Sequence, residues 1–358
     1  MPSASTSRPS PEVVLYGATG YTGRLAARSM ARAGLPMILG GRNRHSLEEM
    51  RHEFDDEYPV RVAAHDDPAA LRELVRGAGA LVTTAGPFGE VGELVVAAAV
   101  EAGVSYVDST GEVDFMAQCF RRHHDAARAR GIAVINACAF EYVLGDCAVE
   151  LAMQAYPQTK HIQVSYWTSS KSISHGTALT LTRMLTGPEF RRTPVTSRQV
   201  DFPAPAGRRW AVTYPGGEAE LLPRRRPGVA IETLLDMPAP MARSARITPV
   251  LTAALRLPGV KRVVDAQIRR MPAGPSAADR PQQEFVILVE ADPGGPQRGV
   301  VVTGADPYGL TGEILARCAA RLSRGEHRVS GVLAPSEAFE PGELLDSLAD
   351  LGVAWRTI

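Results

Sequence analysis

The segment of the chain best suited to chemistry is a glycine-rich turn, Gly17–Gly23, with glycine at its first, fourth and seventh positions. It follows an apolar run, Val13–Tyr16, typical of a buried strand, and precedes a stretch, Arg24–Ala33, typical of a helix. In that context the glycines permit a tight turn, close approach of a pyrophosphate and close packing of helix on strand. We therefore expect a dinucleotide to bind here, with its phosphates at the positive end of the helix; the alternative is an ordinary turn whose glycines serve geometry alone. The residues expected to contact it are Gly17, Thr19, Gly20, Tyr21, Thr22 and Gly23.

The end of the second predicted strand, Pro36–Leu39, indicates which dinucleotide binds. A cofactor without a 2′-phosphate usually meets an acidic residue there, whereas arginine accommodates the phosphate. This chain has Arg42 and Asn43 at that place and no acid. The sequence therefore favours NADP over NAD, with Arg42 and Asn43 as candidate contacts. The alternative is that Arg42 and Arg44 are solvated loop charges.

Two later loops are expected at the same edge of the sheet. One follows the fourth predicted strand, where small residues allow close approach to the nicotinamide half of a cofactor. The other follows the fifth strand and contains Gly111 and Glu112. Glu112 could orient the ribose or the substrate, or it could cap the following helix. The candidate contacts in the first of these loops are Thr84, Ala85, Gly86, Pro87 and Phe88.

Hydride transfer is the cofactor's own chemistry, so the protein must position a substrate and can supply a proton. Glu141 and Tyr142 stand where the chain leaves the sixth predicted strand, and position favours them as catalytic residues. His175 lies at an expected helix start and can donate a proton near neutral pH, although a capping or surface role is the alternative. Tyr308 could donate too, or could pack beneath a helix. Asp146 is expected to cap a helix that begins near Ala148.

These residues are held by two kinds of structure. Strands and helices alternate over residues 1–136, which predicts an α/β, Rossmann-type doubly wound parallel sheet that binds NADP. Over residues 137–325 the rhythm changes to an α+β substrate domain, expected to contain an antiparallel sheet in which Glu284–Ala291 pairs with Gly299–Gly304. Residues 326–358 are expected to return to the first domain.

Together these motifs make the sequence resemble the saccharopine dehydrogenase-like oxidoreductases, in particular the bacterial group of trans-acting enoyl reductases. The resemblance extends over essentially the whole chain. It implies an NADP-binding first domain, a substrate domain inserted before the C-terminal tail, and reduction of a C=C or C=N bond. Relatives commonly have the segment Phe-Asp-x-x-Pro-x-Asp after the sixth strand. The corresponding segment here, Phe140–Asp146, has glutamate in place of the first aspartate and lacks the proline. The resemblance is carried by Gly17–Gly23, Gly40–Arg42, Ala85–Phe88, Tyr106–Asp108, Gly111–Glu112 and Asp306–Tyr308.

Composition narrows the function classes. The 39 basic and 39 acidic residues balance, which argues against a nucleic-acid-binding surface. The cysteines show no metal-like spacing, no apolar run is long enough to span a membrane, and residues 1–12 have no apolar leader core, so we expect a cytoplasmic protein without a metal. We expect an NADPH-dependent reductase of a small metabolite or of an acyl or polyketide intermediate. A homodimer sharing the second sheet is also expected. The competing hypothesis is an NADP-binding sensor or scaffold without turnover.

Overall fold

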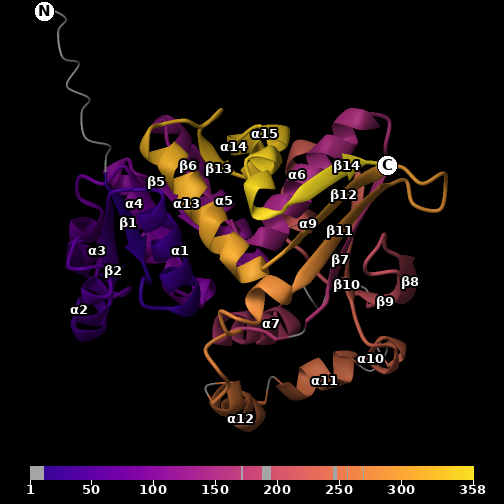
Figure 1. Ribbon diagram of the computed structural model, residues 1–358, viewed down its shortest axis with the longest axis horizontal. Helices are drawn as coiled ribbons and strands as arrows, with labels where there is room; N and C mark the ends of the chain where they lie inside the picture. Colours follow the sequence, from indigo (N-terminus) through magenta and orange to yellow (C-terminus); the bar gives the residue numbers. More distant parts are fainter. Residues whose placement is uncertain (1–11, 171, 188–194, 245–247, 256, 269) are drawn as a thin grey trace, which may run out of the picture.

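The computed structural model describes residues 12–170, 172–187, 195–244, 248–255, 257–268 and 270–358. These residues form two seven-stranded sheets, with long helices between them (Figure 1). In the first sheet every paired strand runs parallel, in the order β13-β6-β5-β4-β1-β2-β3. This confirms the doubly wound α/β prediction. Its strands are β1 (Val13–Tyr16), β2 (Met37–Gly41), β3 (Val60–Val62), β4 (Ala80–Thr83), β5 (Ser105–Asp108), β6 (Ala133–Ile135) and β13 (Gly331–Leu333).

Helices cover both faces of the first sheet, as crossover connections between parallel strands require. Because both faces are buried, its strands are nearly continuous apolar runs, and side chains alternate between two hydrophobic clusters. Val13 and Leu15 belong to one cluster, while Val14 and Tyr16 belong to the other. On the first face lie α1 (Tyr21–Arg32), α2 (Arg44–His52) and α13 (Pro307–Ser323), and on the second lie α3 (Pro68–Val75), α4 (Phe88–Ala102) and α5 (Val113–Ala129).

The second sheet is mixed, with the order β14-β12-β11-β7-β10-β9-β8. The predicted pairing of β11 with β12 is confirmed, with Glu284 opposite Ala305 in an antiparallel ladder. An antiparallel sheet was expected here, but the sheet is mixed, because β10 pairs in parallel with β7. The strands are β7 (His161–Thr168), β8 (Ser197–Asp201), β9 (Arg208–Thr213), β10 (Ala230–Asp236), β11 (Glu284–Ala291), β12 (Gly299–Ala305) and β14 (Ala354–Thr357).

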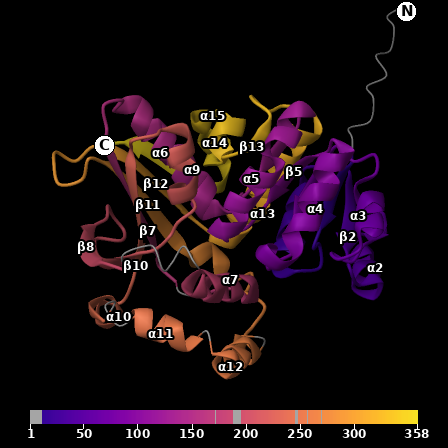
Figure 2. The ribbon, with the colours of Figure 1, turned by 180° about the vertical axis from the view of Figure 1, so that it is seen from behind.

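Helices α6 (Phe140–Ala155) and α9 (Glu218–Arg225) lie along the second sheet (Figure 2). Helix α6 begins at Phe140, eight residues before the start that was expected near Ala148. Asp146 therefore lies within the helix and is not its cap. Its side chain is buried in the middle of α6, where it pairs with Arg225. The true start was hidden because the N-cap residue, Ala139, has no capping side chain. The Phe140 amide instead donates to the Thr311 hydroxyl on α13, at 3.1 Å.

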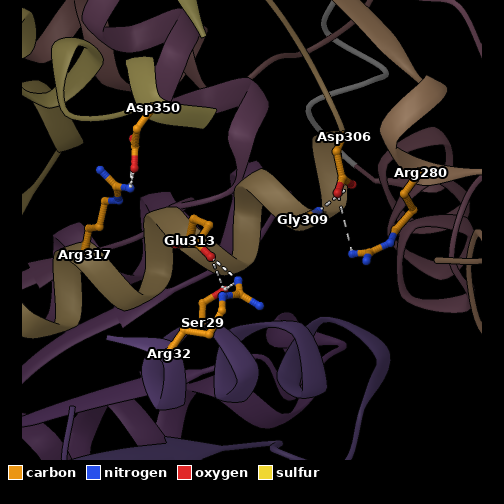
Figure 3. Close-up of polar contacts among 8 residues, drawn as sticks. All are labelled: Ser29, Arg32, Arg280, Asp306, Gly309, Glu313, Arg317 and Asp350. Atoms are coloured by element: carbon orange, nitrogen blue, oxygen red, sulfur yellow. Dashed lines mark hydrogen bonds and ion pairs between the residues drawn. The ribbon is translucent and has the colours of Figure 1, made fainter. Parts of the chain in front are cut away.

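Helix α13 joins the two sheets, because it follows β12 directly and packs along α1. Its Gly312 lies so close to α1 that an added Cβ would stand 3.0 Å from the Leu25 carbonyl carbon. The Glu313 carboxylate accepts from the Ser29 hydroxyl, at 2.8 Å, and from Arg32, both on α1 (Figure 3). This polar contact fixes the first domain against α13.

The end of the chain contributes one strand to each sheet. Strand β13 pairs with β6 in the first sheet, which supports a returning tail, whereas β14 pairs with β12 in the second. The domain boundaries at residues 136 and 325 remain a prediction. In the described part of the chain, the remaining helices of four or more residues are α7 (His175–Thr186), α10 (Ala239–Arg243), α11 (Thr248–Leu255), α12 (Pro258–Ile268), α14 (Pro335–Ala338) and α15 (Pro341–Asp346). Among the residues described, no helix is both long enough and apolar enough to cross a membrane.

Candidate active site

The glycine turn stands at the carboxyl edge of the first sheet, between β1 and α1. Gly17 has φ of +85°, a conformation that favours glycine, and a Cβ there would lie 2.7 Å from the backbone nitrogen of Ala85. The Thr84 hydroxyl donates to the Gly17 carbonyl at 3.1 Å. The turn after β1 and the loop after β4 therefore support each other.

The other two glycines shape the start of α1. A Cβ on Gly23 would overlap the Gly17 carbonyl oxygen and lie 2.7 Å from that of Ala18, so only glycine lets α1 pack this closely on the turn. Gly20 is the N-cap of α1 and no side chain caps the helix there. A helix start without a side-chain cap presents backbone N–H groups to an anion, so this feature fits a dinucleotide pyrophosphate.

A cavity of about 720 Å³ opens beside this turn, with walls from both domains. Its second wall comes from the start of α6, the segment between β7 and α7, the segment before β11 and the start of α13. The predicted site residues that line it are Thr19, Gly20, Tyr21, Thr22, Arg42, Thr84, Gly86, Pro87, Phe88, Gly111, Glu141 and His175.

Other predicted contacts support the cavity from outside its lining. Asn43 caps α2, because its side-chain oxygen accepts from the Ser46 amide at 3.2 Å. Glu112 accepts from the amides of Phe88, at 2.8 Å, and Gly89, at 3.0 Å. The Glu112 side chain thus caps α4, which precedes it in the chain. Glu112 is also the N-cap residue of α5, but its side chain makes no capping bond to that helix. Gly17, Gly23, Ala85 and Tyr142 are likewise absent from the lining residues.

Arg42 is a cation on the cofactor side of the cavity. It is exposed at the end of β2. Arg44, the other arginine of this loop, points to its own helix, where its guanidinium lies 3.7 Å from Glu48. Of the two arginines, Arg42 therefore has the position to meet a 2′-phosphate.

Glu141 and Tyr142 are consecutive residues on the first turn of α6, so their side chains point in different directions. Glu141 is half-buried and lines the cavity, and burial raises the pKa of its carboxyl group. Tyr142 is buried against Gly217, where an added Cβ would stand 3.0 Å from the ring. Burial, with Glu141 and Glu218 nearby, raises the pKa of Tyr142 well above its usual value. Glu141 is thus the better-placed acid.

His175 begins α7 and lines the cavity, but its ring is engaged elsewhere. Nε2 lies within hydrogen-bonding distance of the Met271 carbonyl, and a carbonyl can only accept. Nε2 therefore carries the proton and donates it to that carbonyl. The His175 backbone N–H also donates to Ala273, at 3.2 Å. These contacts tie α7 to the segment before β11.

Tyr308 holds the two walls together. Its hydroxyl accepts from the Ser174 amide at 2.8 Å and lies 3.0 Å from the Thr177 hydroxyl, both at the start of α7. Its ring meets the Tyr21 ring edge-on, with centroids 5.3 Å apart. The Tyr21 hydroxyl in turn donates to the Pro275 carbonyl at 2.6 Å. The second domain is thereby fastened to the glycine turn.

Several lining residues could not be found by sequence reasoning. Hydroxyl side chains from β7, the segment that follows it, α7 and α13 line the substrate side of the cavity, but they belong to no motif and no regular spacing. Their shared position depends on how α7 and α13 pack on the first domain. They are Thr168, Ser170, Ser172, Ser174, Thr177, Thr180 and Thr311.

Beneath the cavity, Asp108 fixes the ends of β5 and β6. Its buried carboxylate accepts from the Thr110 and Ala137 amides, both at 2.9 Å, and from the side chains of Asn136 and Tyr106. Burial raises the pKa of Asp108 to about 6, against the lowering effect of these donors. The carboxylate therefore holds the loop that carries Gly111.

A parallel sheet with a glycine turn, a helix start open to phosphate and a facing second domain is the arrangement of a dinucleotide-binding protein. Comparison with known proteins places the first domain. Residues 13–135 match the saccharopine dehydrogenase NADP-binding domain. The first domain is therefore similar to the NADP-binding domains of this family.

Individual relatives and one solved structure give further likenesses. A trans-acting enoyl reductase of Mycobacterium leprae is 28% identical, with 97% of each chain covered. One of Mycobacterium ulcerans is 34% identical over 38% of this chain, and that match spans 34% of the relative's own length, as for several other mycobacterial relatives. Apo saccharopine dehydrogenase (L-Glu forming) of Saccharomyces cerevisiae superposes with a TM-score of 0.59 at 12% identity, covering 97% of this chain and 100% of that one. This last likeness concerns the fold alone.

Proposed function

We propose that this protein is an NADPH-dependent reductase of a C=C or C=N bond in a small metabolite or in an acyl or polyketide intermediate. The observation that carries the proposal is a single cavity with the glycine turn on one wall and the half-buried acid Glu141 on the other. The names of the mycobacterial relatives favour a C=C bond conjugated to an acyl group.

The first wall would hold the cofactor. The uncapped start of α1 at Gly20 fits the pyrophosphate, and Arg42 fits the 2′-phosphate that distinguishes NADP from NAD. Thr84 and Gly86 would border the nicotinamide half, and Phe88 would pack against it. When bound, the reduced cofactor supplies a hydride, which the chain's own side chains cannot do.

Glu141 would supply the proton. When a hydride forms a C–H bond at one end of the double bond, the π electrons move to the atom at the other end. The Glu141 O–H group then gives its proton to that atom and leaves a carboxylate. A raised pKa suits this role, because it keeps more of the carboxyl group protonated near neutral pH.

Tyr142 and His175 are weaker candidates for the same step. Tyr142 lies outside the cavity lining, and the Nε2 proton of His175 is engaged by a backbone carbonyl. Tyr142→Phe and His175→Ala should each keep turnover within about threefold of wild type, well short of the 10²–10⁴-fold loss typical of a missing acid.

The test uses deuterium-labelled NADPH with enoyl thioesters and with cyclic imines. We expect deuterium to be transferred to an enoyl thioester. Glu141→Gln should reduce kcat by about 10²–10⁴-fold while NADPH affinity is retained. Glu101→Gln, at an exposed position on α4, is the matched control. Full activity of Glu141→Gln would eliminate this residue as the acid. NADPH binding without deuterium transfer to any substrate would favour a sensor or scaffold.

A homodimer and a cytoplasmic location remain predictions. Sedimentation at micromolar protein tests the first, since a species of only 38.3 kDa would contradict it. Fractionation of cells expressing the full chain tests the second.

A further inference from the structure

A second acid, Glu218, is buried behind the wall that carries Glu141. It begins α9, is 1% exposed, and its Oε1 is contacted by the Tyr166 hydroxyl of β7. Its Oε2 has no hydrogen-bond partner within the described residues. A buried carboxylate oxygen without a donor is costly, so the surroundings favour the neutral acid. In agreement, burial raises the pKa of Glu218 to about 8.

Two glycines, Gly145 and Gly216, leave the space that the Glu218 side chain occupies. A Cβ on Gly145 of α6 would overlap both the Tyr166 hydroxyl and Glu218 Oε1. A Cβ on Gly216 would lie 2.8 Å from Glu218 Oε2. The contact between Tyr166 and Glu218 therefore depends on the absence of side chains on two separate segments.

The protonation state of Glu218 determines which group accepts the hydrogen of the Tyr166 hydroxyl. The Tyr166 hydroxyl has one hydrogen but reaches two acceptors, Glu218 Oε1 and the Glu141 backbone carbonyl, the latter at 3.2 Å. If Glu218 is neutral, its O–H group donates to the Tyr166 oxygen, and the Tyr166 hydrogen is available to the Glu141 carbonyl. If Glu218 is ionised, the one hydrogen goes to the carboxylate, and the Glu141 carbonyl loses the tyrosine as a donor.

We propose that Glu218 is a positioning residue, which as a neutral acid directs the Tyr166 hydroxyl to the Glu141 carbonyl and so holds the first turn of α6 at the cavity wall. This inference rests on the proposed function, in which Glu141 is the proton donor. Ionisation of Glu218 releases that turn, so the position of Glu141 depends on pH.

The groups that face Glu218 determine when this release occurs. The acidic neighbours Asp146 and Glu141 disfavour ionisation of Glu218. The groups that interact with it come from several elements: Glu141, Tyr142 and Asp146 on α6, Tyr166 on β7, and Tyr214 after β9.

Glu218→Gln is the informative variant, because its side-chain amide donates to the Tyr166 oxygen at every pH. Hydrogen–deuterium exchange of residues 140–145 would be compared between variant and wild type at the same pH, so that intrinsic exchange chemistry cancels. We expect equal exchange at pH 6.5, and about two- to tenfold faster exchange in wild type at pH 9, the effect of losing one hydrogen bond. Equal exchange at both pH values would overturn the proposal.

Two further measurements separate this proposal from the proposed function. Tyr166→Phe removes the bridging hydroxyl, and it should speed exchange of residues 140–145 at pH 6.5 as well; unchanged exchange would count against the proposal even if Glu218→Gln failed to fold. In the pH profile of kcat, Glu218→Gln should match wild type at pH 6.5 and exceed it at pH 9, with KM unchanged. If exchange behaves as expected but Glu141→Gln remains active, the proton donor is wrong and the positioning stands.

Discussion

Replacing Asp146 by asparagine should lower the free energy of unfolding by about 3–5 kcal/mol, because it leaves a buried cation without its partner. The Asp146 side chain is 1% exposed and that of Arg225 is 9% exposed. Asp146 also accepts from the Ser336 amide at 2.8 Å, and Arg225 donates to the Ser336 hydroxyl. Asparagine keeps the shape but loses the charge. Three distant segments, α6, α9 and α14, meet at this pair and would all be affected.

Equilibrium urea unfolding followed by circular dichroism measures this loss. The matched control is Arg317→Ala, which breaks the more exposed ion pair with Asp350 and should cost no more than about 1 kcal/mol. Replacing both partners, by Asp146→Leu and Arg225→Met, should recover most of the stability, since a well-packed apolar pair needs no countercharge. A loss below about 1 kcal/mol for Asp146→Asn would refute the reasoning, because the buried charge would then be satisfied elsewhere.

Three other predictions concern the cofactor and pH. Arg42→Ala should weaken NADPH binding by about 10- to 150-fold and leave NADH binding nearly unchanged, as a charge-assisted contact contributes about 1.5–3 kcal/mol; calorimetric titration giving equal losses would contradict the assignment. Gly23→Ala should cost about 1–3 kcal/mol of stability and lower NADPH affinity, because its Cβ would overlap a backbone oxygen, whereas Gly259→Ala, in open space on α12, should do neither. The folded-state pKa of Glu218 is raised from 4.5 to about 8, so its contribution to stability is complete below pH 4.5 and is lost as pH rises towards 8. The loss is up to about 5 kcal/mol, and urea unfolding of Glu218→Gln should lack this pH dependence.

The first domain was predictable because its signals are local. The strand at Val13–Tyr16, the glycine turn and the following helix lie next to one another in the chain, and the parallel sheet is confirmed by the pairing of β1 with β2 and β4. The carboxyl edge of such a sheet gathers its loops in one place, so the lining positions of Arg42 and Thr84 followed from strand order alone.

The substrate side was harder to predict because its signals are distant. Helix α6 is capped by Thr311 from α13, so nothing near Phe140 marks its start. That start decides which of Glu141 and Tyr142 faces the cavity, since consecutive helical residues point about 100° apart. The parallel pairing of β10 with β7 also joins segments with no common local pattern.

The return of β13 to the first sheet has a consequence for how the protein is made. Strand β6 is complete at residue 135, but its neighbour at the sheet edge comes from residues 331–333, after nearly all of the second sheet has been synthesised. Until then the backbone groups along that side of β6 lack their partner strand, and an open strand edge is a template for pairing with other chains. A nascent or truncated chain that ends before residue 331 should therefore be prone to aggregation, even though its glycine turn and most of its first sheet are already present.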